Sequence, residues 1–225
     1  MNPSAPHILL INPNSSVATS RMMRDIAQRA AGPRLTVVDA TAVRSPSMIV
    51  TTAELAAAAA EVVEIGTAHG PGCAGIIVAA FGDPGLEMLK ARVAVPVVGI
   101  CEASMRAAAR GGRRFAVATV TPDLLASIAE AADRLGLSAL FTGTRTSGGD
   151  PLALAQDPER LAAALAEQVN ACIAEDGAQA VIIGGGPLGE AAETLQPLFP
   201  VPVLAPIRCA VDLLLERIAA SVDAS

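Results

Sequence analysis

Residues 74–102, AGIIVAAFGDPGLEMLKARVAVPVVGICE, decide the fold of this chain. The apolar run at 75–80 is too short for a globular helix and rich in β-branched residues, which indicates a buried strand. The turn FGDPG follows at 81–85, and then we expect a helix over 86–92 and a second strand over 95–100. Open α/β sheets bind ligands at such strand ends, although this unit alone is equally typical of a plain turn.

The same order of elements recurs in the second half of the chain. Residues 178–190, AQAVIIGGGPLGE, read as an apolar strand, a turn rich in glycine and proline, and the start of a helix. The segments 7–14 and 114–122 correspond in the same way, as do 95–99 and 201–205. The repeat predicts an α/β fold of two pseudo-symmetric lobes, each a short, largely parallel sheet flanked by helices.

The domain organisation follows from where the repeat restarts. We expect lobe one at residues 1–110, with a contribution from a C-terminal helix at 208–222, and lobe two at 111–207. The remaining expected elements are strands at 8–11, 35–39, 115–119, 137–142 and 180–184, helices at 51–69, 102–110, 122–135 and 158–175, and an irregular segment at 144–157 that either covers the cleft or is a surface connection.

Composition excludes several classes of function. With 225 residues, 52% of them hydrophobic and only 17% charged, the chain can bury a large core. Its net charge of −6 and its lack of Trp and Tyr argue against a nucleic-acid partner. No apolar run reaches the ~18 residues of a membrane helix, and no signal peptide is recognisable. We therefore expect a cytoplasmic protein that binds neither nucleic acid nor membranes.

The four cysteines carry no metal-binding or disulfide signature. Cys73, Cys101, Cys172 and Cys209 have no CxxC spacing and no histidine cluster nearby, which indicates a reduced compartment and no metal site. The low charge combined with high apolar content predicts spare hydrophobic surface, and hence a homo-oligomer.

Three motifs resemble the aspartate/glutamate/hydantoin racemase superfamily, most closely its hydantoin and allantoin racemase branch. They are LINPNS at 10–15, AFGDPGL at 80–86 and PVVGICEA at 96–103, and the resemblance covers nearly the whole chain in order. It implies two lobes with the ligand between them, a cofactor-independent enzyme and a homo-oligomer. Relatives tend to carry a glutamate near the position of Val50, so the pocket here is expected to differ in polarity.

The resemblance also implies a mechanism that this chain lacks the groups to perform. In the family, two cysteines face opposite sides of an acidic carbon–hydrogen bond, and one thiolate removes the proton while the other thiol returns one. The matching positions here are Ala80 and Gly185, whose side chains cannot carry a proton. We interpret Cys101 as a buried, inert thiol and Cys209 as the outside candidate for a replacement, and the catalytic residues stay unknown.

The resemblance implies that the chain keeps the ligand-binding residues of the family site, although it lacks the two cysteines. Backbone N–H groups and polar side chains on the strand-end loops suit a carboxylate or a ring carbonyl. Asp83 and Glu102 also match the family, and we interpret Asp83 as a turn former or helix cap rather than a base. The expected binding residues are Asn12, Asn14, Ser15, Ala80, Phe81, Gly82, Thr119, Thr121, Gly185, Gly186 and Pro187.

Three functional interpretations stay open at this point. The favoured one is a divergent enzyme, an isomerase, lyase or decarboxylase, acting on a hydantoin-, amino-acid- or dicarboxylate-like ligand without the two-cysteine mechanism. The second is a binding protein that has kept the pocket. The third, a hydantoin or amino-acid racemase whose cysteines were removed deliberately, fits Ala80 better than the glycine run around Gly185.

Overall fold

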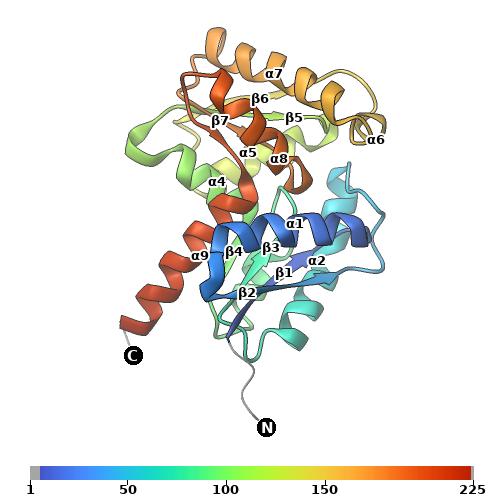
Figure 1. Ribbon diagram of the computed structural model, residues 1–225, viewed down its shortest axis with the longest axis vertical. Coiled ribbons are helices and arrows are strands. Elements are labelled where there is room, and N and C mark those ends of the chain that lie inside the picture. Colours follow the sequence, from blue (N-terminus) through green and yellow to red (C-terminus); the bar gives the residue numbers. More distant parts are fainter. Residues whose placement is uncertain (1–5, 224–225) are drawn as a thin grey trace.

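The computed structural model describes residues 6–223, which form two four-stranded parallel sheets and the helices that flank them (Figure 1). The first half contains β1 (His7–Asn12), α1 (Val17–Ala31), η1 (Gly32–Arg34), β2 (Thr36–Thr41), α2 (Thr52–His69), β3 (Gly75–Val78), α3 (Leu86–Lys90), β4 (Val97–Gly99), α4 (Ile100–Ala108) and η2 (Arg110–Gly112). The second contains β5 (Phe115–Thr119), η3 (Pro122–Leu124), α5 (Leu125–Arg134), β6 (Phe141–Thr146), α6 (Pro151–Leu154), α7 (Pro158–Ala174), β7 (Ala180–Ile183), η4 (Gly186–Leu188), α8 (Gly189–Leu195), η5 (Gln196–Leu198), β8 (Val203–Leu204) and α9 (Pro206–Asp223).

The internal repeat of the sequence is confirmed by the topology. The strand order is β2-β1-β3-β4 in the first sheet and β6-β5-β7-β8 in the second, with every neighbouring pair parallel. In register, Ile11 pairs with Val78 and Ala118 pairs with Ile183. Asn12 directly follows Ile11 and Thr119 directly follows Ala118, so these two residues are equivalent in the repeat. Ala80 and Gly185 are equivalent in the same way, because each lies two residues after the paired Val78 or Ile183.

Alternating side chains of each sheet pack into separate apolar layers. In the first sheet, Leu9 and Ile76 face α2 and α3, whereas Ile8 and Ile77 face a central core that also contains residues of α1, α4 and α9. In the second sheet, the central core takes Phe115 and Ile182, and the opposite face packs on α7 and α8. One core thus joins both lobes, and the lobe bounds at residues 110 and 207 stay a prediction.

The last helix connects the lobes a second time. Figure 1 shows α9 leaving the second lobe and running along the first, where it packs on α1 and α4. The glycines at 111 and 112, which follow the last residue expected in lobe one, have φ of 74° and 77°, a region that L side chains rarely adopt. None of the helices in the described part combines the length and the hydropathy needed to cross a membrane.

The strand expected over 137–142 is wrong by four residues. Residues 137–140 instead form a turn after α5, in which the N–H groups of Leu140 and Phe141 both donate to the carbonyl of Leu137. Strand β6 begins at Phe141, and its register shifts between Phe115 and Ala116 of β5. The apolar side chains of Leu137 and Leu140 pack on the core from this turn, which explains why they resemble a strand in the sequence.

A glycine run brings the second lobe into contact with the first. A Cβ atom on Gly186 would lie 2.5 Å from the sulfur of Met23 in α1 and 3.1 Å from the carbonyl oxygen of Ala79. A Cβ on Gly184 would lie 2.7 Å from Val117 and 3.6 Å from the ring of Phe81. Only glycine therefore lets the β7–η4 turn sit this close to the loop after β3.

Adding one methyl group at this contact is expected to destabilise the protein. We predict that Gly186→Ala lowers the free energy of unfolding by about 1–3 kcal/mol, because the carbonyl of Ala79 is backbone and cannot move aside. Gly148→Ala is the control, since a Cβ there meets nothing within 4 Å, and it should change stability by less than ~0.5 kcal/mol. Urea unfolding curves of both variants measure this, and equal midpoints would contradict the close approach.

Candidate ligand-binding site

A cavity of about 330 Å³ lies between the lobes, at the carboxyl ends of strands from both sheets. The loop after β3 contributes Ala79, Ala80 and Phe81, and the turn after β7 contributes residues 184–188. The equivalent positions Ala80 and Gly185 thus line the same space. The polar side chains that line it are those of Asn14, Ser16, Thr19, Ser47, Thr121 and Gln156.

The first loop is held by a network that starts at a buried asparagine. The Asn12 side-chain N–H donates to Asn14 Oδ1 at 2.8 Å and to Ser20 Oγ at 2.9 Å, and it has no exposed surface. Asn14 Oδ1 also accepts the backbone N–H of Ser16, whose hydroxyl caps α1 by accepting the N–H of Thr19 at 3.2 Å. Asn12 therefore fixes Asn14 against the cavity without lining it.

The equivalent loop of the second lobe is held by hydroxyl groups. Thr119 is fully buried, and its Oγ1 donates to the carbonyl of Gly184 at 2.7 Å and lies 3.1 Å from Thr121 Oγ1. Thr121 lines the cavity, whereas Thr119 lies behind it. The two threonines thus tie the β5 loop to the glycine turn that forms the opposite wall.

Seven of the eleven residues expected at the site line the cavity: Asn14, Ala80, Phe81, Thr121, Gly185, Gly186 and Pro187. The other four do not. Asn12 and Thr119 form hydrogen bonds to neighbouring residues that do line it. The backbone N–H of Ser15 donates to the carbonyl of Pro46. Gly82 has φ of 116° in the turn after β3 and lies against Leu55. The site assignment as a whole stays a prediction.

Further residues, which the sequence did not predict, reach the cavity from the segments after β2 and β6. Ser47, Met48 and Ile49 come from the first segment, and Leu152 and Gln156 come from the second, in and just after α6. Two signals pointed there: the altered polarity near Val50 and the irregular segment at 144–157. Because the second segment supplies lining residues, it covers the cleft and is more than a surface connection.

The cavity carries no charge. Among the described residues that line it, none is Asp, Glu, Lys, Arg, His or Cys. Burying an unpaired carboxylate or ammonium group in such surroundings costs several kcal/mol, whereas neutral amides and carbonyls can bond to the hydroxyl, amide and backbone groups present. A carboxylate here would have only backbone N–H, hydroxyl and amide groups as partners and no side-chain cation, whereas an uncharged ligand needs no counter-charge.

The cysteines all lie outside the cavity lining. Cys101 is fully buried in α4, and burial raises the pKa of its thiol well above the usual value, as expected for an inert group. Burial also raises the pKa of Cys172 and of Cys209 to about 12. Cys73 lies 3.3 Å from His7 Nε2 at the other end of the first sheet. In the described residues, no group of three or more His, Cys, Asp or Glu side chains could hold a metal ion.

Asp83 has the capping role that the sequence suggested. Its carboxylate accepts the backbone N–H groups of Cys101 at 2.9 Å and Glu102 at 2.7 Å, in the first turn of α4. Asp83 itself has φ of 53°, and a Cβ on Gly99 would collide with its carboxylate. Burial raises the pKa of Asp83 to about 7, although the two N–H bonds act to lower it.

A buried carboxylate, that of Glu102, ties α4 to its neighbours. Glu102 accepts hydrogen bonds from Arg217 of α9 at 2.6 Å, Lys90 of α3 at 3.0 Å and Arg106 at 3.2 Å. Burial acts to raise the pKa of Glu102, and the bonds from Arg217 and Lys90 lower it below the usual value. Both family-matching carboxylates thus serve the helix that follows β4, and neither faces the cavity.

The chain is similar to known racemases in sequence and in structure. A family model described as Asp/Glu/Hydantoin racemase matches residues 8–214. A hydantoin racemase of Rhizobium meliloti is 29% identical over 208 residues, which are 92% of this chain and 86% of that protein. The solved allantoin racemases of Klebsiella pneumoniae and Pseudomonas fluorescens are 27% and 26% identical, each with a TM-score of 0.90. They are matched over 96% of this chain and over 89% and 92% of their own.

The raised pKa of Asp83 makes a testable difference to stability. Its usual value is 3.8 and its folded value about 7, so the folded state binds the proton more tightly and loses stability as pH rises between the two. Relative to Asp83→Asn, we predict that the free energy of unfolding of the unaltered protein falls by up to about 4 kcal/mol from pH ~4 to pH ~7. Denaturant titrations across this range measure it. A difference that rises with pH would show that the helix N–H bonds outweigh burial.

Proposed function

This chain belongs to the Asp/Glu/hydantoin racemase family, and on that premise we propose that its interlobe cavity binds a small, uncharged, hydantoin-like molecule without inverting it by a two-thiol mechanism. The observation that carries the proposal is the uncharged lining. Of the ligand classes expected from the sequence, amino acids and dicarboxylates would each bury a carboxylate with no cation beside it. A hydantoin ring offers two carbonyls and two N–H groups and no charge.

The lining offers partners for the ring of such a molecule and for its substituent. The side chain of Gln156 offers a donor and an acceptor, and the hydroxyl of Thr121 can do either, which suits an amide-like ring. Asn14 offers its N–H groups, because its Oδ1 already accepts hydrogen bonds from Asn12 and Ser16. Met48, Ile49 and Leu55 supply apolar surface for a substituent on the ring. The volume of about 330 Å³ is at the lower end for ligand pockets, so the substituent must be small.

The part of the proposal that concerns chemistry rests on two positions. Inversion needs a base and an acid within reach of the same carbon from opposite faces. Ala80 and Gly185, which the family resemblance aligns with the cysteine pair, line the cavity and are equivalent in the repeat. They face the ligand space with a methyl group and a bare Cα, so a ligand there has no thiol on either side.

A second candidate function is an isomerase or lyase activity that uses another proton carrier. The observation in its favour is the hydroxyl pair of Thr119 and Thr121, with their Oγ1 atoms 3.1 Å apart, beside the glycine turn. A hydroxyl or a bound water is a far weaker base than a thiolate, so this activity would be slow. In either case we propose that the protein works in the cytoplasm, needs no cofactor and self-associates.

Filling the cavity should abolish binding. We predict that Ala80→Leu raises the dissociation constant for isopropylhydantoin at least ~10-fold, because the longer side chain occupies ligand space. Ala57→Leu, on the exposed face of α2, adds the same atoms where they meet water and is the matched control. Isothermal titration calorimetry measures both, and equal affinities would place the ligand elsewhere.

Restoring the thiols should restore proton transfer. In deuterium oxide, exchange at the substituted ring carbon of isopropylhydantoin is expected to run at the buffer rate with the unaltered protein. The double variant Ala80→Cys/Gly185→Cys should raise it by ~10²-fold or more. Gly185 has extended backbone with φ of 162°, so cysteine fits there once Leu188, 2.9 Å from the new Cβ, moves.

The double serine variant at the same two positions controls for the added volume and is expected to stay at the buffer rate. Nuclear magnetic resonance follows the loss of the ring proton in each sample. Fast exchange in the unaltered protein, blocked by a competing hydantoin, would favour the second candidate and overturn the claim that the site moves no proton.

A further inference from the structure

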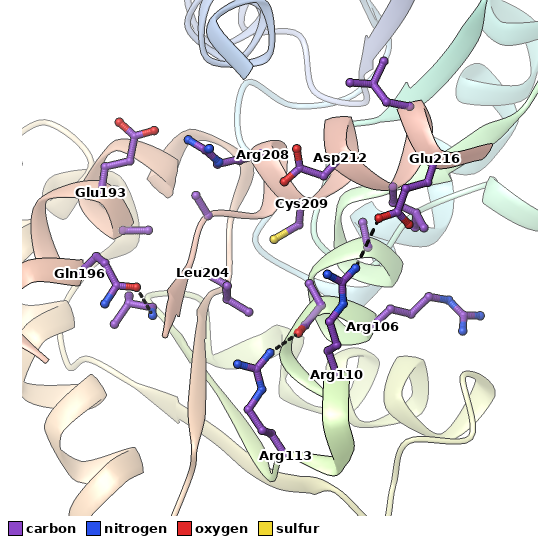
Figure 2. A pocket seen from close by; sticks show the side chains of 17 residues that line it. Arg106, Arg110, Arg113, Glu193, Gln196, Leu204, Arg208, Cys209, Asp212 and Glu216 are labelled. Carbon is purple, nitrogen blue, oxygen red and sulfur yellow. Dashed lines mark hydrogen bonds and ion pairs between the residues drawn. The ribbon is translucent and has the colours of Figure 1, made fainter. Parts of the chain in front are cut away.

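The hollows of the molecule differ in where they hold charge. The groove between α4, α8 and α9 is lined by four arginines and three carboxylates, among them the ion pair of Arg110 and Glu216 (Figure 2). The interlobe cavity has no charged lining. Two carboxylates of α2, those of Glu54 and Glu61, instead bond to the backbone of residues 43–50, here called the covering segment, which supplies part of that lining.

Glu61 holds the start of the covering segment. It is buried, and its Oε1 accepts the backbone N–H of Val43 at 2.8 Å while its Oε2 accepts that of Arg44 at 3.1 Å. The guanidinium of Arg44 lies 3.7 Å from the same carboxylate. Both oxygens are therefore used, and bonds to a charged acceptor are stronger than bonds to a neutral one.

Glu54 holds the other end in the same manner. Its Oε2 accepts the backbone N–H groups of Val50 at 2.9 Å and Thr51 at 3.0 Å. These bonds hold the pKa of Glu54 below its usual value, as expected when N–H donors favour the charged carboxylate. Glu54 and Glu61 lie two helix turns apart on one face of α2, which separates them by roughly 10 Å along the helix axis.

The covering segment is longer than the distance between its two points of attachment. A chain extended from Arg44 to Val50 would reach ~20 Å, about twice the spacing of the two glutamates. The surplus forms an arch, in which no hydrogen bond joins two residues of the covering segment to each other. The N–H of Ser15 donates to the carbonyl of Pro46 at 3.1 Å and tethers the arch once more. Residues 47–49, in the second half of the arch, line the cavity.

We propose that Glu54 and Glu61 are positioning residues that set which hydantoins the cavity accepts, by holding Met48 and Ile49 against the substituent on the ring. The inference rests on the proposed function and goes beyond it, because neither glutamate lines the cavity. The polar groups proposed for the ring come from other segments and would stay in place if the covering segment were released. Only the apolar surface beside the substituent would be lost, so selectivity should fall while binding of the ring persists.

Two ligands and two matched variants test this in the whole protein. A glutamine side chain has one carbonyl acceptor, so Glu61→Gln leaves one N–H of the covering segment facing an NH₂ group. We expect this variant to raise the dissociation constant for isopropylhydantoin at least ~5-fold and that for unsubstituted hydantoin less than ~2-fold. Glu64→Gln is the control and should change neither, because the Glu64 carboxylate bonds to the exposed side chain of Arg44 rather than to backbone. Isothermal titration calorimetry measures all four changes.

A double-mutant cycle ties the effect to the covering segment. Met48→Ala should itself weaken binding of isopropylhydantoin, and in combination with Glu61→Gln the two losses should multiply to less than their product, because both remove the same contact. Glu54→Gln should reproduce the change in selectivity from the other end. It takes the place of Glu61→Gln if that variant loses its helical circular dichroism.

A measurement without ligand tests whether the glutamates hold the covering segment. In methyl nuclear magnetic resonance spectra, the Met48 signal should move toward that of a free side chain in Glu61→Gln, whereas the signal of Met105, fully buried in α4, should not move. An unchanged Met48 signal, an equal loss of affinity for both hydantoins, or losses that multiply fully would each overturn the proposal. Failure of the unaltered protein to bind either hydantoin would overturn the proposed function as well, whereas failure of this inference alone leaves hydantoin binding intact.

Discussion

The close approach of the glycine run at 184–186 to the loop after β3 is the constraint on which the rest of the structure depends. Gly186 lies against the carbonyl of Ala79 and the side chain of Met23, so at this contact the backbone of the second lobe approaches the first lobe with no side chain of its own in between. The same backbone forms a wall of the cavity, and the distance between the lobes therefore sets its width. Hydrogen bonds from Thr119 and Asn12 then fix the loops on either side.

A consequence of this arrangement is that charge is used for architecture and kept out of the cavity. Asp83 is half-buried and Glu102 is buried, and they bond to the start of α4 and to basic side chains of α3 and α9. The cavity between the lobes has only hydroxyl, amide and backbone groups as polar lining. Such a site can orient a neutral ring, and it lacks the thiols that would move a proton across it.

Much of the fold and part of the candidate site could be predicted from the sequence, because the same order of strand, turn and helix occurs in both halves of the chain. The two-lobe α/β fold, the equivalence of Ala80 with Gly185 and the capping role of Asp83 follow from periodicity and the position of turns, and the buried Cys101 follows from the family resemblance. What failed depended on tertiary contacts. Strand β6 begins after a turn whose leucines imitate a strand, and the part that α6 plays in covering the cavity depends on packing between lobes that no local pattern records.

The measurement that tests the central claim most directly is a crystal structure of the protein grown with isopropylhydantoin. The account predicts the ring between Ala80 and Gly185, with its carbonyl and N–H groups bonded to backbone, hydroxyl and amide groups, and no ionisable side chain against the carbon that carries the substituent. A ring bound there with a cysteine, an aspartate or another ionisable group in contact with that carbon would contradict it. So would a ligand bound outside the interlobe cavity.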